Sequence, residues 1–129
     1  MKKEILIIDD SRPIRFLLHT ILQKHYKVTS VPDGLSAMFY LKEETNTDLI
    51  IVDPDLPDMP NWELVKHLST SFFFRSIPII TVSNQPLEIT RTQAMKYNVA
   101  GFYMKPFNPL EILEAVDNII FGNVAKKIS

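Results

Sequence analysis

The chain has 129 residues, 46% of them hydrophobic and 22% charged, which is the size and composition of one globular domain with a packed core. Its 14 basic and 15 acidic residues give a formal net charge of −1, which excludes the strongly basic surface that nucleic acids and anionic membranes attract. It has no cysteine, which excludes disulfides and cysteine-bound metals, and no apolar run near the roughly 20 residues that span a bilayer, so we expect a cytoplasmic protein.

The first half of the chain alternates short apolar runs with helical patterns. Residues 5–8 are Ile and Leu and predict a buried strand. Residues 14–22 follow with apolar side chains at the i, i+3, i+4 spacing of an amphipathic helix, for which Ser11 is the candidate N-cap. A weaker apolar run at 27–31 predicts a second strand, and residues 35–42 predict a second helix.

The second half repeats this alternation. Each unit is a short hydrophobic strand followed by a helical pattern, and the strands of the first two units are rich in β-branched residues, as expected for strands that are buried on both faces of a sheet. The regular alternation predicts an α/β fold, with a doubly wound parallel sheet that helices cover on both faces. The three units are 49–52 with 62–68, 77–82 with 87–97, and 100–104 with 110–121.

Polar side chains follow four of the strands, at the edge where open α/β sheets bind ligands. They are Asp9 and Asp10, Asp53, Ser83 and Lys105. Three carboxylates at one edge would repel one another unless a hard divalent cation bound them, and oxygen ligands without histidine or cysteine favour Mg²⁺. A carboxylate nucleophile with Mg²⁺, a lysine and a hydroxyl can stabilise a phosphoryl group in transfer. Asp53 is therefore the candidate phosphoryl acceptor.

At these residues the sequence resembles the response regulator receiver family of two-component signalling. The resemblance implies a flavodoxin-like (βα)5 sheet with strand order 2-1-3-4-5, of the single-domain, chemotaxis-regulator-like kind. It implies a receiver domain over residues 1–122 and a short tail at 123–129. The matching segments are ILIIDDS at 5–11, DLIIVDPDLPDM at 48–59, IPIITVS at 77–83 and GFYMKPF at 101–107.

The resemblance also implies roles for the acidic residues. Asp53 would accept a phosphoryl group from a histidine kinase or a phosphotransfer protein. Asp9, Asp10 and Asp53 would hold Mg²⁺ together with the backbone carbonyl of Asp55, whose side chain would face the incoming group. Lys105 would pair with the phosphoryl oxygens, and its bond to the following proline would be cis.

The switch and output residues follow from the same resemblance. Ser83 would move toward the phosphoryl oxygens, and Phe102 would turn into the space that Ser83 leaves. The fourth helix, fifth strand and fifth helix would form the surface for a downstream protein target, which is also a candidate homodimer interface. The chain would be a regulator that catalyses only its own phosphorylation and dephosphorylation.

Two departures from the family pattern lie near the acceptor. Pro60-Asn61 replaces the usual Asp-Gly, and since Asn tolerates positive φ better than other non-glycine residues, we expect the turn to survive there. Asn84 stands where the family prefers a small residue, and we expect it to slow the loss of the phosphoryl group.

Other interpretations remain open from the sequence. Asp53-Pro54-Asp55 is similar to the DxD motif of haloacid-dehalogenase-like phosphatases, although that motif follows the first strand of a longer chain. A degenerate receiver that binds partners without phosphorylation is a further alternative. A nucleotide-binding Rossmann domain is disfavoured because no GxGxxG follows the first strand. We interpret the aromatic run 72–74 as one or two rings that cap the core, the alternative being an exposed partner patch.

Overall fold

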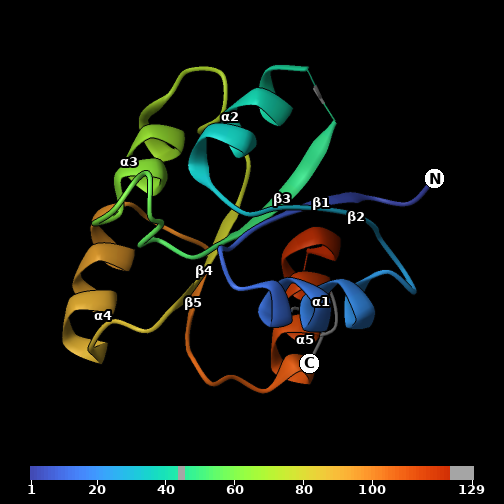
Figure 1. Cartoon of the computed structure of the whole chain (residues 1–129). Helices are drawn as coiled ribbons and strands as arrows, with labels where there is room; N and C mark the ends of the chain where they lie inside the picture. The colour runs from blue at the N-terminus through green and yellow to red at the C-terminus, as the bar shows by residue number, and fades with distance from the viewer. Residues whose placement is uncertain (44–45, 123–129) are drawn as a thin grey trace.

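The computed structural model describes residues 1–43 and 46–122, so the expected tail at 123–129 lies outside the described residues. A single five-stranded sheet has the order β2-β1-β3-β4-β5, and all its neighbouring strands are parallel (Figure 1). The strands are β1 Glu4–Ile8, β2 Lys27–Val31, β3 Thr47–Val52, β4 Ile79–Ser83 and β5 Gly101–Met104; the helices are α1 Arg12–Leu22, α2 Gly34–Glu43, α3 Glu63–Thr70, α4 Leu87–Lys96 and α5 Pro109–Phe121. The predicted alternation and strand order are confirmed.

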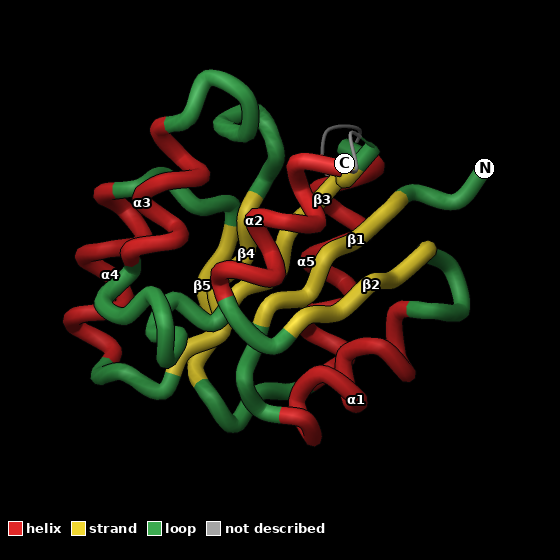
Figure 2. Tube along the Cα trace, turned by 45° about the horizontal axis from the view of Figure 1, so that its top comes forward, coloured by secondary structure: helices red, strands yellow, loops and turns green. Residues whose placement is uncertain are grey.

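Helices cover both faces of the sheet, as Figure 2 shows, and this explains the apolar runs of the central strands. In β1, Leu6 and Ile8 point into one core, whose other members come mainly from α2, α3 and α4. Ile5 and Ile7 alternate with them and point into a second core, under α1 and α5. No described helix combines the length and the apolar composition that crossing a membrane requires.

The starts of α1 and α5 are set by side-chain caps. The predicted N-cap Ser11 accepts a hydrogen bond from the backbone N–H of Ile14 at 3.3 Å, and Asn108 does the same for Leu110 at 2.9 Å. Each of these helices also has a proline in its first turn, where a missing N–H costs no hydrogen bond. The caps fix where the chain leaves β1 and β5 and so position the polar residues between strand and helix.

The start of α2 is capped from a distant part of the chain. The two carboxylate oxygens of Asp58, in the loop between β3 and α3, each accept one backbone N–H, from Gly34 and Leu35, both at 2.9 Å. Asp33 accepts the next free N–H, that of Ser36, at 2.7 Å. Met59 packs so closely over Gly34 that a Cβ there would lie 2.4 Å from its sulfur, so a larger residue at position 34 would make the Met59 side chain shift. The β3–α3 loop is thereby held against α2.

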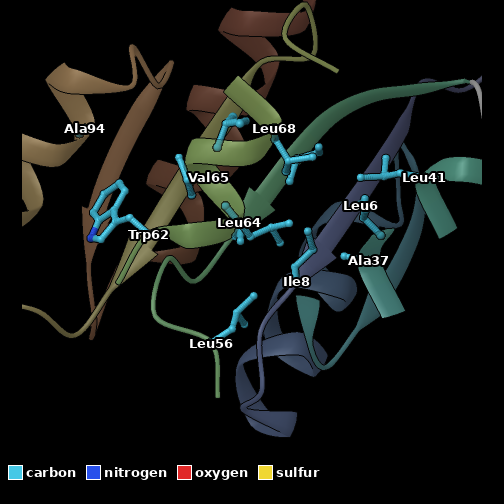
Figure 3. Packing of buried hydrophobic residues seen from close by; sticks show 13 residues of the cluster. Leu6, Ile8, Ala37, Leu41, Leu56, Trp62, Leu64, Val65, Leu68 and Ala94 are labelled. Atoms are coloured by element: carbon cyan, nitrogen blue, oxygen red, sulfur yellow. The ribbon is translucent and has the colours of Figure 1, made fainter. Parts of the chain in front are cut away.

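The same loop contains two consecutive residues with left-handed backbone. Asn61 has φ 56°, as expected for the residue that replaces glycine, and Trp62 has φ 66°. A bulky residue is uncommon in this conformation, and here the indole is held in place by burial and by a hydrogen bond from Nε1 to Oε1 of Gln85 at 2.7 Å. Figure 3 shows Trp62 in the core on the side of Ala94 of α4. Trp62 therefore anchors the start of α3, which begins one residue later.

Candidate functional site

The three aspartates predicted to converge do so at the carboxyl edge of the sheet. Asp9 and Asp10 follow β1, and Asp53 follows β3, which is hydrogen bonded to β1 along its length. One carboxylate oxygen of each lies within 4.8 Å of the others. Asp9 and Asp53 are buried, whereas Asp10 is exposed. The cluster therefore has one open side, toward solvent.

Lys105 provides a positive charge inside this cluster. Its ammonium nitrogen lies 2.9 Å from Oδ2 of Asp9 and 2.9 Å from Oδ2 of Asp53, and all three side chains are less than one tenth exposed. Burial alone would lower the pKa of Lys105, but the hydrogen bonds to Asp9 and Asp53 outweigh it and the pKa is raised. One cation thus faces two buried carboxylates and the exposed Asp10, and the site keeps an excess of negative charge.

The two buried carboxylates are oriented by backbone groups. Oδ1 of Asp9 accepts the N–H of Ser11 at 2.9 Å, and Oδ1 of Asp53 accepts the N–H of Asp55 at 2.8 Å. Burial raises the pKa of Asp9, although its bonds with Lys105 and with the Ser11 N–H act in the opposite direction. Each carboxylate therefore has one oxygen on a backbone N–H and the other on Lys105.

Asp55 and the Lys105–Pro106 bond lie in the loops that follow β3 and β5. One carboxylate oxygen of Asp55, whose side chain the resemblance orients toward the incoming phosphoryl group, accepts the N–H of Asn61 at 2.9 Å. The left-handed turn at Asn61 presents this N–H to the carboxylate and holds it against its own loop. The Lys105–Pro106 peptide is cis, as expected.

Ser83 belongs to a hydrogen-bond network that the sequence did not indicate. Its buried hydroxyl oxygen accepts the N–H of Gln85 at 2.9 Å. The hydroxyl of Thr90, on α4, lies 3.4 Å from this oxygen and 3.3 Å from the carbonyl of Gln85, so it can donate to either. Because Trp62 donates to the Gln85 side chain, the network joins the β3–α3 and β4–α4 loops. Neither Gln85 nor Thr90 follows a strand directly, so the pattern gave no signal for them.

Phe102 lies on β5 and is half-buried against the core beneath α2, α3 and α4. Its register partner on β4 is Thr81, two residues before Ser83. The predicted switch pair therefore occupies neighbouring strands on one side of the sheet. Asn84, the residue after Ser83, is exposed.

Comparison with known proteins identifies the family. The model of the response regulator receiver domain matches residues 5–117. The chain belongs to the response regulator receiver family. The regulatory protein VanRc of Enterococcus gallinarum is 29% identical over 117 residues, which cover 90% of this chain and 49% of VanRc. The chemotaxis protein CheY1 of Helicobacter pylori is 26% identical over 122 residues, which cover 93% of this chain and 98% of CheY1.

Solved structures agree with this assignment. The chemotaxis response regulator CheY4 of Vibrio cholerae superposes on this receiver with a TM-score of 0.81 at 26% identity, over 92% of this chain and 99% of that one. The chain spans about half the length of VanRc and of a second curated relative, 49% and 52%. It is thus a receiver domain of two-component response regulators, a signalling domain, and the phosphatase and Rossmann alternatives are set aside.

Receiver domains interact with histidine kinases and with downstream targets, and they typically bind Mg²⁺ at an acidic cluster. In this receiver the corresponding cluster is Asp9, Asp10 and Asp53. Its ligand atoms are hard carboxylate oxygens that lie close together, and one of its members faces solvent. This donor set fits Mg²⁺, which binds to one or two carboxylates and keeps several waters or phosphate oxygens.

Proposed function

We propose that Asp53 accepts a phosphoryl group, with the help of Mg²⁺, from a histidine kinase or phosphotransfer protein, and that the aspartyl phosphate switches the protein contacts of this receiver. The observation that carries the proposal is the placement of the Asp53 carboxylate between Asp9, Asp10 and the ammonium of Lys105, 2.9 Å away. The complete set of charged groups argues against a degenerate receiver.

The transfer forms one bond and breaks one bond. A carboxylate oxygen of Asp53 attacks phosphorus, the bond from phosphorus to the donor's imidazole nitrogen breaks, and the imidazole leaves with the electron pair of that bond. The N–H of Asp55 fixes the Asp53 carboxylate for this attack by binding Oδ1. Lys105 already touches the other oxygen and would follow the phosphoryl oxygens as they arrive, supplying positive charge where the negative charge is transferred.

Asp9, Asp10, Asp53 and the backbone carbonyl of Asp55 would hold the metal ion. When bound, Mg²⁺ would offset the mutual repulsion of these carboxylates and of the incoming phosphoryl oxygens. Asp9 contributes a carboxylate that is already oriented by the Ser11 N–H, so its position does not depend on the ion. The open side at Asp10 is the route by which an ion can enter.

The hydrogen bonds of Ser83 suggest how the switch operates. A serine hydroxyl has one hydrogen to donate, and Ser83 uses its oxygen to accept from the N–H of Gln85. A phosphoryl group adds about −1.5 to −2 charges and three acceptor oxygens beside it. Movement of Ser83 toward them would break its contacts with Gln85 and Thr90, alter the start of α4 and open space for Phe102. The modification would thereby shift a population between two states.

The expected output surface consists of α4, β5 and α5, and its exposed apolar side chains support this role. On α4, Leu87, Ile89 and Met95 are 44%, 49% and 74% exposed. A helix start that responds to Ser83 would move these side chains directly. The surface is thus suited to a downstream target or to a homodimer that forms after phosphorylation.

Incubation with acetyl phosphate tests the proposal. With Mg²⁺, intact mass should show the gain of one phosphoryl group on the wild type and none on Asp53→Asn, and EDTA should abolish the gain. Beryllofluoride, a phosphoryl mimic, should bind the wild type only, and sedimentation of that complex would show whether it dimerises. The absence of any Mg²⁺-dependent modification of the wild type would overturn the proposal.

A further inference from the structure

A groove lies at the edge of the sheet opposite the aspartates. It has a volume of about 720 Å³ and is bounded by α2, by α3 and by the segment at 71–77 that leads into β4. Thr47, the first residue of β3, also lines it. Figure 1 shows the segment at 71–77 beside α2. The residues that line the groove are Met38, Leu41, Lys42, Thr47, His67, Ser71, Phe73, Phe74 and Ile77.

The aromatic run at 72–74 borders this groove, and only one of its rings is used by the core. Phe74 packs against the core beneath α2 and α3, which confirms part of our interpretation. Phe72 and Phe73 remain 78% and 80% exposed, with their rings edge-to-face at 5.7 Å. Adjacent exposed aromatic rings are a feature of surfaces that bind partners.

The backbone of this segment is ordered by its own hydrogen bonds. The carbonyl of Ser71 accepts the N–H of Arg75 at 2.9 Å, and the hydroxyl of Ser71 accepts the N–H of Phe73 at 3.2 Å. The N–H of Ile77 bonds to the carbonyl of Phe74 at 3.0 Å. The two rings are therefore presented by a defined turn, and a partner would lose little conformational entropy from it on binding.

Two positive side chains lie at the rim of the groove. Lys42 lines it, and the guanidinium of Arg75 lies 5.5 Å from the ring centre of Phe72, which is next to the lining residue Phe73. None of its described lining residues is acidic. The exposed Glu43 lines a different hollow, with Leu35 and Phe39. An apolar groove with a basic rim complements a ligand that is apolar and acidic.

We propose that this groove binds an amphipathic helical segment of a partner protein, in which aliphatic or aromatic anchor residues are flanked by carboxylates. A volume of about 720 Å³ accommodates several side chains rather than one. Its walls are two helices, as in the grooves that take up an amphipathic helix through anchors at i, i+3 or i+4 and i+7. The groove lies at the other edge of the sheet from Asp53, so this binding does not require phosphorylation.

The test uses two sets of synthetic helical peptides with isotope-labelled receiver. Both sets carry Leu, Phe or Trp anchors at i, i+3 or i+4 and i+7; one set has Glu at the positions between them, and the other has Lys. We expect peptides of the acidic set to bind, with amide shifts confined to α2, α3 and 71–77, and with weaker binding at higher salt. Asp53→Asn should bind them as the wild type does.

Variants identify the contacts. Phe73→Ser should weaken binding by about tenfold or more, because an aromatic anchor is lost. Phe16→Ser is the matched control, since Phe16 is 73% exposed on α1, on the other face of the sheet, and it should leave binding unchanged. Lys42→Glu should weaken the acidic peptides and strengthen the basic ones. All three side chains are exposed, so the variants should fold, which amide spectra will show.

Several results would overturn the proposal. They are the failure of every acidic peptide to bind at millimolar concentration, equal binding of the basic set, and amide shifts that lie elsewhere. Self-association of the receiver that Phe73→Ser abolishes would identify a second copy as the occupant, and would also overturn it.

Discussion

Replacement of Lys105 by methionine removes the only described cation within hydrogen-bonding distance of the two buried carboxylates, Asp9 and Asp53. Each pair is separated by 2.9 Å, and with an effective dielectric constant of about 20 each attraction is worth about 6 kcal/mol. The desolvation of the three groups, several kcal/mol for each ion, offsets most of this sum. A net loss of roughly 3–5 kcal/mol is the usual result when one member of a buried pair is removed.

Thermal unfolding in EDTA at pH 7 measures this loss, and Lys105→Met should lower the melting temperature by roughly 10–20 °C. Lys27→Met is the matched control, because Lys27 is 65% exposed and 3.7 Å from Glu4, so its ion pair contributes little. Mg²⁺ should stabilise Lys105→Met more than the wild type, since the variant presents three carboxylates without a competing ammonium. At Mg²⁺ concentrations above its Kd, each tenfold increase in Mg²⁺ adds about 1.4 kcal/mol to the free energy of unfolding of the protein that binds it.

The stability deficit of Lys105→Met should also depend on pH, in a direction that the pKa of Asp9 determines. Burial already raises the pKa of Asp9, and without Lys105 the pKa of this carboxyl should rise further. A group whose pKa is raised on folding stabilises the native state at low pH and loses that contribution as pH rises through the raised value. The deficit of Lys105→Met should therefore shrink on acidification from pH 8 to 5. A deficit like that of Lys27→Met, or equal stabilisation of wild type and variant by Mg²⁺, would refute this account of the charges.

Three further predictions concern the loops around the site. Beryllofluoride with Mg²⁺ should change the fluorescence of Trp62, the single tryptophan, because Ser83 and the indole both bond to Gln85; an unchanged spectrum on saturation would contradict the link. Asn84→Ala should shorten the life of the aspartyl phosphate, measured by loss of phosphoryl mass, and equal rates would remove Asn84 from the explanation. Burial acts to raise the pKa of Asp58, but the hydrogen bonds that it accepts from backbone N–H groups outweigh burial and lower the pKa. The ionised Asp58 therefore stabilises the fold at pH values above the ordinary pKa of an aspartate, and this contribution is lost as pH falls through the lowered pKa. Asp58→Ala should accordingly unfold more easily than the wild type at pH 7 and match it near pH 2 in urea titrations; a deficit that persists there would show that the charge is not responsible.

The sequence was sufficient for the architecture because the apolar runs and their order determine a parallel sheet. It also predicted that Asp9, Asp10, Asp53 and Lys105 lie close together, since the carboxyl ends of parallel strands meet at one edge of the sheet. The start of β4 was less predictable: the strand begins at Ile79 and not at 77, because Pro78 lacks the N–H that a strand pair needs.

The features that the sequence did not reveal depend on loop geometry. The bonds of Ser83 to Gln85 and Thr90 require the turn before α4, and no periodic pattern describes a turn. The exposure of Phe72 and Phe73 was also hidden, because apolar composition favours burial and only the turn that Ser71 organises decides which rings point outward. Such contacts join residues through the folded chain rather than through spacing.

The capping of α2 by Asp58 has a consequence for the order in which this receiver folds. The acceptor, Asp58, comes 24 residues after Gly34 and 23 residues after Leu35, and β3 lies between the donors and the acceptor. A ten-residue helix is marginal by itself in water, and without this cap α2 begins with two N–H groups unsatisfied. Helix α2 therefore gains its full stability only after β3 has docked beside β1 and the following loop has turned back. Its first turn is formed by residues from the first third of the chain, but its cap depends on a carboxylate that comes 23 or 24 positions later.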